Sequence, residues 1–192
     1  MGGMASAPPT FGIQRRGVRM TELPINVCRV DTREGTKDYV TCLSHEQVFE
    51  RGLPAEAIIG VLLCPLKSGE AITPAVFARN RVFVDFMQGV IARRGADLPG
   101  FIAEGRRQGD GWVYVVDQRT PTPRGAVPPE DIVGAFEVKG GQVVPGSYRP
   151  SPKHLILSSS GFFRLGSELQ QCLLAELAAL AESGGATDPD TT

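Results

Sequence analysis

Most of the residue types that carry chemistry in enzymes are scarce in this chain. Only two of its 192 residues are histidine, His45 and His154, and its four cysteines contain no C-x-x-C pair. A metal site built on histidine or cysteine would need ligands gathered from distant parts of the chain. Lysine and arginine number 20 and aspartate and glutamate 21, so the net charge is −1. A balance this even creates no field that attracts nucleic acid.

Long apolar runs are missing as well. No segment approaches the roughly 20 apolar residues that span a bilayer, and the N-terminus has no apolar stretch typical of a signal sequence. We therefore expect a cytoplasmic protein that binds neither membrane nor nucleic acid. In that reducing setting the cysteines stay free and act as small buried hydrophobes. They are Cys28, Cys42, Cys64 and Cys172.

The common catalytic motifs do not occur either. His45-Glu46 lacks the second histidine of H-E-x-x-H, because position 49 is phenylalanine. There is no G-x-x-x-x-G-K-[ST] phosphate loop, and the glycine-rich stretch 105–111 precedes a strand, whereas a dinucleotide fingerprint follows one. We expect no cofactor and no bound metal.

The remaining composition is that of an ordinary globular chain, with 42% hydrophobic and 21% charged residues. We expect a single globular domain over residues 21–182, long enough to bury a core without disulfides. Residues 1–20 and 183–192 show no hydrophobic period, which predicts two disordered tails.

The N-terminal half alternates strand and helix signals. Strand-like residues 24–30 and 39–43, separated by a polar turn, predict an antiparallel hairpin. Ser44 to Gln47 form a capping box that opens a short helix ending at Arg51. The apolar run 58–64 predicts a buried strand.

The clearest helix signal begins at Thr73-Pro74, an N-cap residue followed by proline. Apolar residues then recur at helical spacing as far as Arg94, where glycine follows. This pattern predicts a long amphipathic helix over 73–94. Residues 99–107 predict one or two further helical turns.

The C-terminal half is dominated by turn residues. Residues 112–116 predict a strand, and residues 118–129 hold four prolines, too many for a helix or a central strand. The strand pattern resumes over 132–138. Gly140-Gly141 then predicts a tight hairpin turn, since glycine supplies the positive φ angles it needs.

Two more elements complete the prediction. Residues 154–157 predict a strand, and Ser167 opens a second capping box before leucines spaced as on one helix face. The fold class is therefore α+β: a mainly antiparallel sheet of about five to seven strands with the long helix and a C-terminal helix on it.

The polar side chains most suited to a site cluster in the two proline-rich loops that flank the predicted hairpin. Loops of this length held between strands are often functional. The alternative without a functional role is that Asp117 and Arg119 form an exposed ion pair and that the loops pack in the ordinary way. We take the candidate binding residues to be Asp117, Arg119, Arg124, Tyr148, Arg149 and His154.

Together these features favour a non-enzymatic protein of bacterial type that binds another protein, as an immunity-like, adaptor or accessory subunit. The alternatives are a small hydrolase or transferase using Asp117, Arg119 and His154, or a domain that binds a small ligand. A pocket that holds Asp117 within hydrogen-bond reach of His154 would favour the enzyme. A flat surface built from the loops would favour the binding protein.

Overall fold

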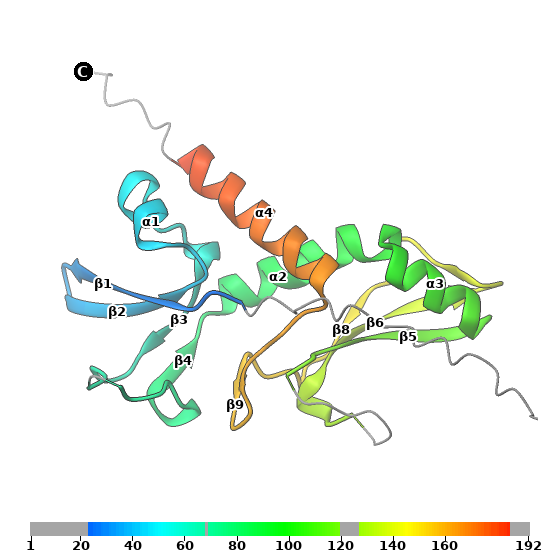
Figure 1. The fold of residues 1–192 in the computed structure, drawn as a ribbon, viewed down its shortest axis with the longest axis horizontal. Coiled ribbons are helices and arrows are strands. Elements are labelled where there is room, and N and C mark those ends of the chain that lie inside the picture. Colours follow the sequence, from blue (N-terminus) through cyan, green and yellow to red (C-terminus); the bar gives the residue numbers. More distant parts are fainter. Residues whose placement is uncertain (1–22, 68, 120–126, 185–192) are drawn as a thin grey trace, which may run out of the picture.

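The computed structural model describes residues 23–67, 69–119 and 127–184. α-Helices and antiparallel strands make up this part of the chain, which confirms the predicted α+β class. Two four-stranded sheets lie toward opposite ends of the molecule, with helices α2 (Arg81–Arg94) and α4 (Ser167–Gly184) between them (Figure 1). The prediction of one larger sheet is wrong, because the described strands divide between these two sheets and a separate hairpin.

The first sheet has the order β1-β2-β3-β4, with every neighbouring pair antiparallel. Its strands are β1 (Asn26–Thr32), β2 (Gly35–Thr41), β3 (Ile58–Leu62) and β4 (Phe77–Arg79). β1 and β2 form the predicted hairpin, but only Arg33 and Glu34 separate them. The polar turn is shorter than predicted, because Asp31 and Asp38 belong to the strands and have partners across the hairpin.

Helix α1 (His45–Arg51) follows the sequence prediction closely. The Ser44 side chain accepts the backbone N–H of Gln47, and the Gln47 side chain accepts the N–H of Ser44. Gly52 ends the helix with φ of 84°, a conformation that favours glycine. This helix contacts α4 at the end of the molecule that holds the first sheet.

Helix α2 begins later than predicted. Thr73 and Pro74 lead into a single 3₁₀ turn, after which Phe77–Arg79 pairs with β3 as strand β4. The true N-cap is Asn80, whose side chain accepts the N–H of Val82 at 3.0 Å. The prediction of a helix starting at Thr73 is wrong because pairing with β3 extends a segment whose local signals favour a helix start.

The second sheet has the order β5-β6-β7, and β8 also pairs with β6. Its strands are β5 (Gly111–Val116), β6 (Ile132–Lys139), β7 (Gln142–Val143) and β8 (Arg149–Pro150). Gly140 and Gly141 have φ of 56° and 77°, as the predicted hairpin turn requires. Helix α3 (Pro99–Gln108) lies on this sheet, where Phe101 contacts Phe136 with ring centres 5.6 Å apart.

The strand predicted over 154–157 is largely wrong. Strand β9 (Leu157–Ser158) begins only at the last of these residues and pairs with β10 (Gly161–Phe162) in a small hairpin. Helix α4 starts at Ser167 itself, so this serine is the first helical residue rather than the predicted cap. The four short 3₁₀ turns of the described chain are Ala55–Ala57, Pro74–Val76, Gly95–Asp97 and Pro129–Asp131.

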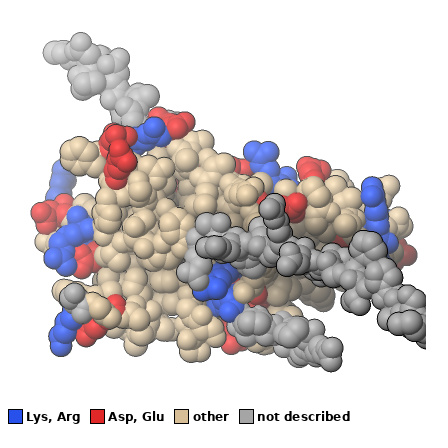
Figure 2. Space-filling view, viewed as in Figure 1, with Lys and Arg blue, Asp and Glu red and all other residues tan. Residues whose placement is uncertain are grey.

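A single buried cluster joins the two sheets. It contains Ile59 from the first sheet and Phe136 from the second, and the leucines Leu173 and Leu177 of α4 are fully enclosed in it. Within the described ranges, no helix combines the length and apolar character needed to cross a lipid bilayer. On the face drawn in Figure 2, basic and acidic side chains are interspersed.

Candidate functional site

Asp117 lies directly after β5 and is completely buried. Its backbone N–H is donated to the carbonyl oxygen of Asp131 at 2.7 Å, which extends the contact between β5 and β6. Its Oδ1 accepts the backbone N–H groups of Arg119 at 3.0 Å and Arg164 at 2.9 Å. The carboxylate therefore orders two loops that the sequence places far apart.

The guanidinium of Arg119 has no exposed side-chain surface. It pairs with Asp117 at 3.0 Å and with Asp131 at 2.9 Å. It also donates to the carbonyl oxygens of Gly161 at 3.0 Å, Glu130 at 3.1 Å and Leu155. The expectation of an exposed ion pair is wrong, because these side chains lie inside and their donors and acceptors are used.

His154 completes the group, which we call the Arg119 clasp: the side chains of Asp117, Arg119, Asp131 and His154. The Nε2 atom of His154 lies 3.1 Å from Asp117 Oδ2, and the residue is only 4% exposed. Its ring lies perpendicular to that of Phe163, with ring centres 6.4 Å apart. The clasp therefore fixes both the position and the orientation of the imidazole.

The other candidate residues lie elsewhere. The ring of Tyr148 lies 4.9 Å from that of Phe136, and its hydroxyl donates to the side chain of Gln88. Burial raises the pKa of Tyr148. Arg149 is exposed, and its guanidinium carbon is 5.4 Å from the centre of the Trp112 ring.

The six sequence candidates thus separate. Asp117, Arg119 and His154 come together in the clasp, while Tyr148 and Arg149 lie on the second sheet, and Arg124 lies outside the described residues. The exposed Arg149 can contact a macromolecule directly, whereas the fully enclosed carboxylate and guanidinium groups of the clasp cannot.

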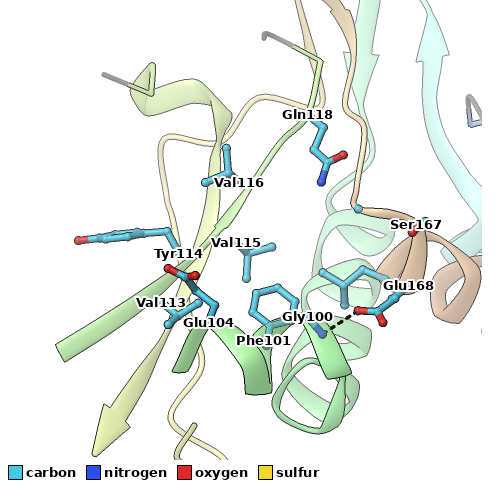
Figure 3. Close-up of a pocket in the computed structure, with 12 residues that line it drawn as sticks. Gly100, Phe101, Glu104, Val113, Tyr114, Val115, Val116, Gln118, Ser167 and Glu168 are labelled. Carbon is cyan, nitrogen blue, oxygen red and sulfur yellow. Dashed lines mark hydrogen bonds between the residues drawn. The ribbon is translucent and has the colours of Figure 1, made fainter. Parts of the chain in front are cut away.

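A hollow of about 680 Å³ lies beside β5, between the starts of α3 and α4 (Figure 3). Its lining includes four successive residues of the strand, Val113 to Val116. Because side chains alternate between the two faces of a sheet, a hollow lined by all four must lie at the edge of the strand. Apolar side chains such as Phe101 and Leu169 form most of the remaining wall.

The hydrogen-bond pattern shows which backbone groups of β5 reach this edge. Glu137 lies opposite Trp112, but its N–H is donated to Ser147 Oγ at 3.0 Å and its carbonyl accepts the N–H of Val144 at 2.9 Å. Trp112 and Glu137 therefore form a pair without mutual hydrogen bonds, and the backbone groups of Trp112 and Tyr114 point away from β6. No described residue forms a hydrogen bond with the N–H of either one.

Sequence reasoning missed Trp112 and Tyr114 as site residues, although their signal was present. They alternate with Val113 and Val115, which are buried, so the pattern itself places the two aromatic residues on the solvent side. What the pattern cannot show is that β5 ends its sheet.

The described residues offer no group of three or more His, Cys, Asp or Glu side chains that could hold a metal ion. All four cysteines are free thiols. Cys28 and Cys42 are buried as expected, and burial raises the pKa of Cys42 to about 12. Cys64 is exposed, so the expectation of burial is wrong for this residue.

Comparisons of the chain with protein-family models, with curated proteins and with solved structures found no match.

Proposed function

We propose that this chain is a non-enzymatic module that binds another protein by taking an extended segment of it along the open edge of β5. The observation that supports it most directly is the hollow of about 680 Å³ at that edge, which Tyr114 lines. The backbone groups of Tyr114 and of Trp112, which precedes the lined part of the strand, face outward along the same edge. An added strand satisfies such groups and gains affinity from its main chain.

The side chains beside the edge support this proposal. Tyr114 is 58% exposed, and Arg149 stacks over Trp112 on the same face of the sheet. Tryptophan, tyrosine and arginine are the residues that most often dominate binding energy at protein interfaces. An exposed edge strand without proline or lysine also lacks the usual protection against pairing.

The lining of the hollow indicates the kind of segment that fits. Apolar walls suit a strand with apolar side chains at alternate positions. Two carboxylates, Glu104 of α3 and Glu168 of α4, line the hollow as well. Glu104 is already paired with Arg107, whereas Glu168 accepts only the backbone N–H of Gly100 among the contacts of the described residues. We therefore expect a basic residue in the bound segment near Glu168.

The enzyme alternative has one specific observation in its favour. Asp117 lies within hydrogen-bond reach of His154, and His154 lines a separate cavity. The clasp nevertheless uses its carboxylates and guanidinium for internal contacts, which leaves His154 as its single residue beside that cavity. We therefore keep a small hydrolase or transferase as the second candidate. A cytoplasmic location remains part of the proposal, since free thiols suit a reducing compartment.

Selection from a library of short random peptides displayed on phage, with the purified full chain as bait, tests the proposal. Enriched sequences are then synthesised, and their dissociation constants are measured by fluorescence polarisation. We expect micromolar binders with apolar residues two positions apart and at least one basic residue. Failure to enrich any peptide above background would overturn the proposal.

Two variants at one position separate backbone recognition from side-chain contact. Tyr114→Ala removes the ring, whereas Tyr114→Pro also removes the N–H that faces the open edge. No bond to β6 is lost in either, so both should fold, which thermal melts can verify. We expect the proline variant to bind about tenfold more weakly than the alanine variant, about 1.4 kcal/mol. Phe49→Ala, at a 93% exposed residue on α1, is the control and should bind normally. Equal binding by all three variants and the wild type would place the interface elsewhere.

A further inference from the structure

A second hollow, of about 480 Å³, lies between the start of α2 and the turn that precedes His154. Arg79, Arg81 and Gln88 line one side of it, and Ser151 and His154 line the other. It shares no lining residue with the hollow beside β5. An inference about this cavity therefore does not rest on the proposed function.

The charges around the cavity favour an anion. Arg79 and Arg81 both line it, and the N-terminus of α2 adds the positive end of a helix dipole. Asp85 is the single carboxylate among the lining residues that the structure describes, 3.6 Å from Arg81. Two guanidinium groups against one carboxylate leave a net positive cavity.

His154 supplies a second and independent indication of a ligand. It is only 4% exposed, yet it is one of the residues that line the cavity. Its Nε2 is bound to Asp117, which as a carboxylate can only accept, so this nitrogen carries the hydrogen. In the neutral ring Nδ1 is then a hydrogen-bond acceptor, and no described residue donates to it. With the ring neutral, His154 therefore offers one hydrogen-bond acceptor in a cavity that Arg79 and Arg81 also line.

The orientation of Gln88 is fixed in a similar way. Its Oε1 accepts a hydrogen bond from the hydroxyl of Tyr148. Its Nε2 donates a hydrogen bond to the carbonyl oxygen of Val133 at 3.4 Å. An amide held by its oxygen keeps its NH₂ group on the opposite side. The wall beside α2 is thus polar and ordered before any ligand arrives.

We infer that this cavity binds a small phosphate-bearing molecule that also carries a hydroxyl donor. Arg79 and Arg81 would bind the phosphate oxygens, because guanidinium matches phosphate in charge and geometry. Nδ1 of His154 would accept the hydroxyl. Inorganic hydrogen phosphate is the simplest member of this class, since it carries both the charge and the O–H.

Titration of the full chain with inorganic phosphate at neutral pH tests the inference. The Cε1–H region of a proton–carbon NMR spectrum gives one signal each for His154 and His45, which a His45→Gln variant assigns. His45 is exposed on α1 and serves as the internal control. We expect the His154 signal to shift with a dissociation constant of about millimolar, and the His45 signal to stay in place. Chloride at matched ionic strength should shift neither signal.

Variants and a second anion make the test specific. Arg79→Gln combined with Arg81→Gln should weaken phosphate binding by about tenfold or more, whereas Arg33→Gln, at an exposed position between β1 and β2, should leave it unchanged. Sulfate has no O–H at neutral pH and should bind more weakly than phosphate. An unmoved His154 signal, an equal response to chloride, or full binding by the double variant would overturn the site. Equal binding of sulfate would overturn the role assigned to Nδ1.

Discussion

Arg119 connects several separate segments of the second half of the chain. It bonds to groups on residues 117, 130–131, 155 and 161 and is fully enclosed among them. Its two carboxylate partners, Asp117 and Asp131, are also buried. Removing the cation from such a group leaves two charges in a poorly solvating interior, which costs more than the loss of the hydrogen bonds themselves.

Arg119→Ala should therefore destabilise the fold strongly. We expect its free energy of unfolding, measured with urea, to fall by about 3–5 kcal/mol. Arg149→Ala is the matched control, because that arginine is exposed and loses a contact with Trp112 worth about 0.5–1 kcal/mol. Similar losses in both variants would show that the clasp is not a stabilising element.

The environment of Asp38 predicts that the stability of the fold depends on pH in the acidic range. Arg29 lies opposite it in the hairpin and donates bonds of 2.7 and 2.9 Å to its two carboxylate oxygens. These bonds, aided by charge attraction and opposed by burial, hold the pKa of Asp38 below its ordinary value. A depressed pKa in the folded state means that the stabilisation is fully present above about pH 3.9, the ordinary value for aspartate. It is lost as the pH falls through the lower folded-state value.

Urea unfolding of wild type and Asp38→Asn across the acidic range measures this effect. The wild type should be more stable at neutral pH, and the difference should shrink as the pH falls below about 4. A difference in unfolding free energy that stays constant over this range would mean that ionisation of Asp38 does not contribute.

At the scale of elements, the β6–β7 hairpin depends on two glycines with positive φ. A side chain at position 140 would meet no neighbouring atom within 4 Å, so crowding is not the obstacle. The obstacle is backbone strain, because a β-branched residue is unfavourable at φ of 56°. Gly140→Val should therefore lower the free energy of unfolding by about 1–2 kcal/mol.

The measurement is a denaturant midpoint at unchanged slope. A matched substitution at an exposed strand position, Gln142→Val in β7, separates backbone strain from the effect of adding an apolar side chain. If both variants unfold at the same midpoint, the turn does not need glycine at position 140.

Elements that local chemistry specifies were predictable from the sequence. The capping box at Ser44 and the turn at Gly140-Gly141 depend on residues within a few positions of each other. Strand β4 was not predictable, because it exists only through pairing with β3, and Thr73-Pro74 is a better local helix start than Asn80. Tertiary pairing overrides propensity in such segments.

The candidate site shows the same division. Asp117 and Arg119 stand two positions apart, so their proximity could be predicted, but their complete burial could not. His154 is 37 residues from Asp117 in sequence, and only the fold brings the two together. The sequence predicted that Arg79 and Arg81 both belong to one long helix. In the structure they line a cavity at the junction of β4 and α2.

For the whole molecule, the shared core predicts cooperative unfolding. Although two sheets are present, α4 contacts both α1 and α2, and Glu176 pairs with Arg93 and Arg94 of α2. Leu173 and Leu177 are fully buried in the one core cluster that residues of both sheets share, so separation of the sheets would expose that core. We therefore expect residues 21–182 to behave as one domain.

Differential scanning calorimetry tests this expectation. A single transition, with equal calorimetric and van't Hoff enthalpies, is the expected result. Two resolved transitions, or a van't Hoff enthalpy well below the calorimetric one, would mean that the two sheets unfold independently.

The Arg119 clasp also makes the chain suitable for engineering. Arg119 and Asp131 are joined at 2.9 Å, so these two described residues are held together although they stand 12 positions apart in the sequence. Each doubling of the chain length between two joined points costs only about 0.6 kcal/mol in closure entropy. A reporter peptide or a small guest domain inserted between residues 120 and 127 should be carried without unfolding its host, which makes this position a natural point at which to attach a label.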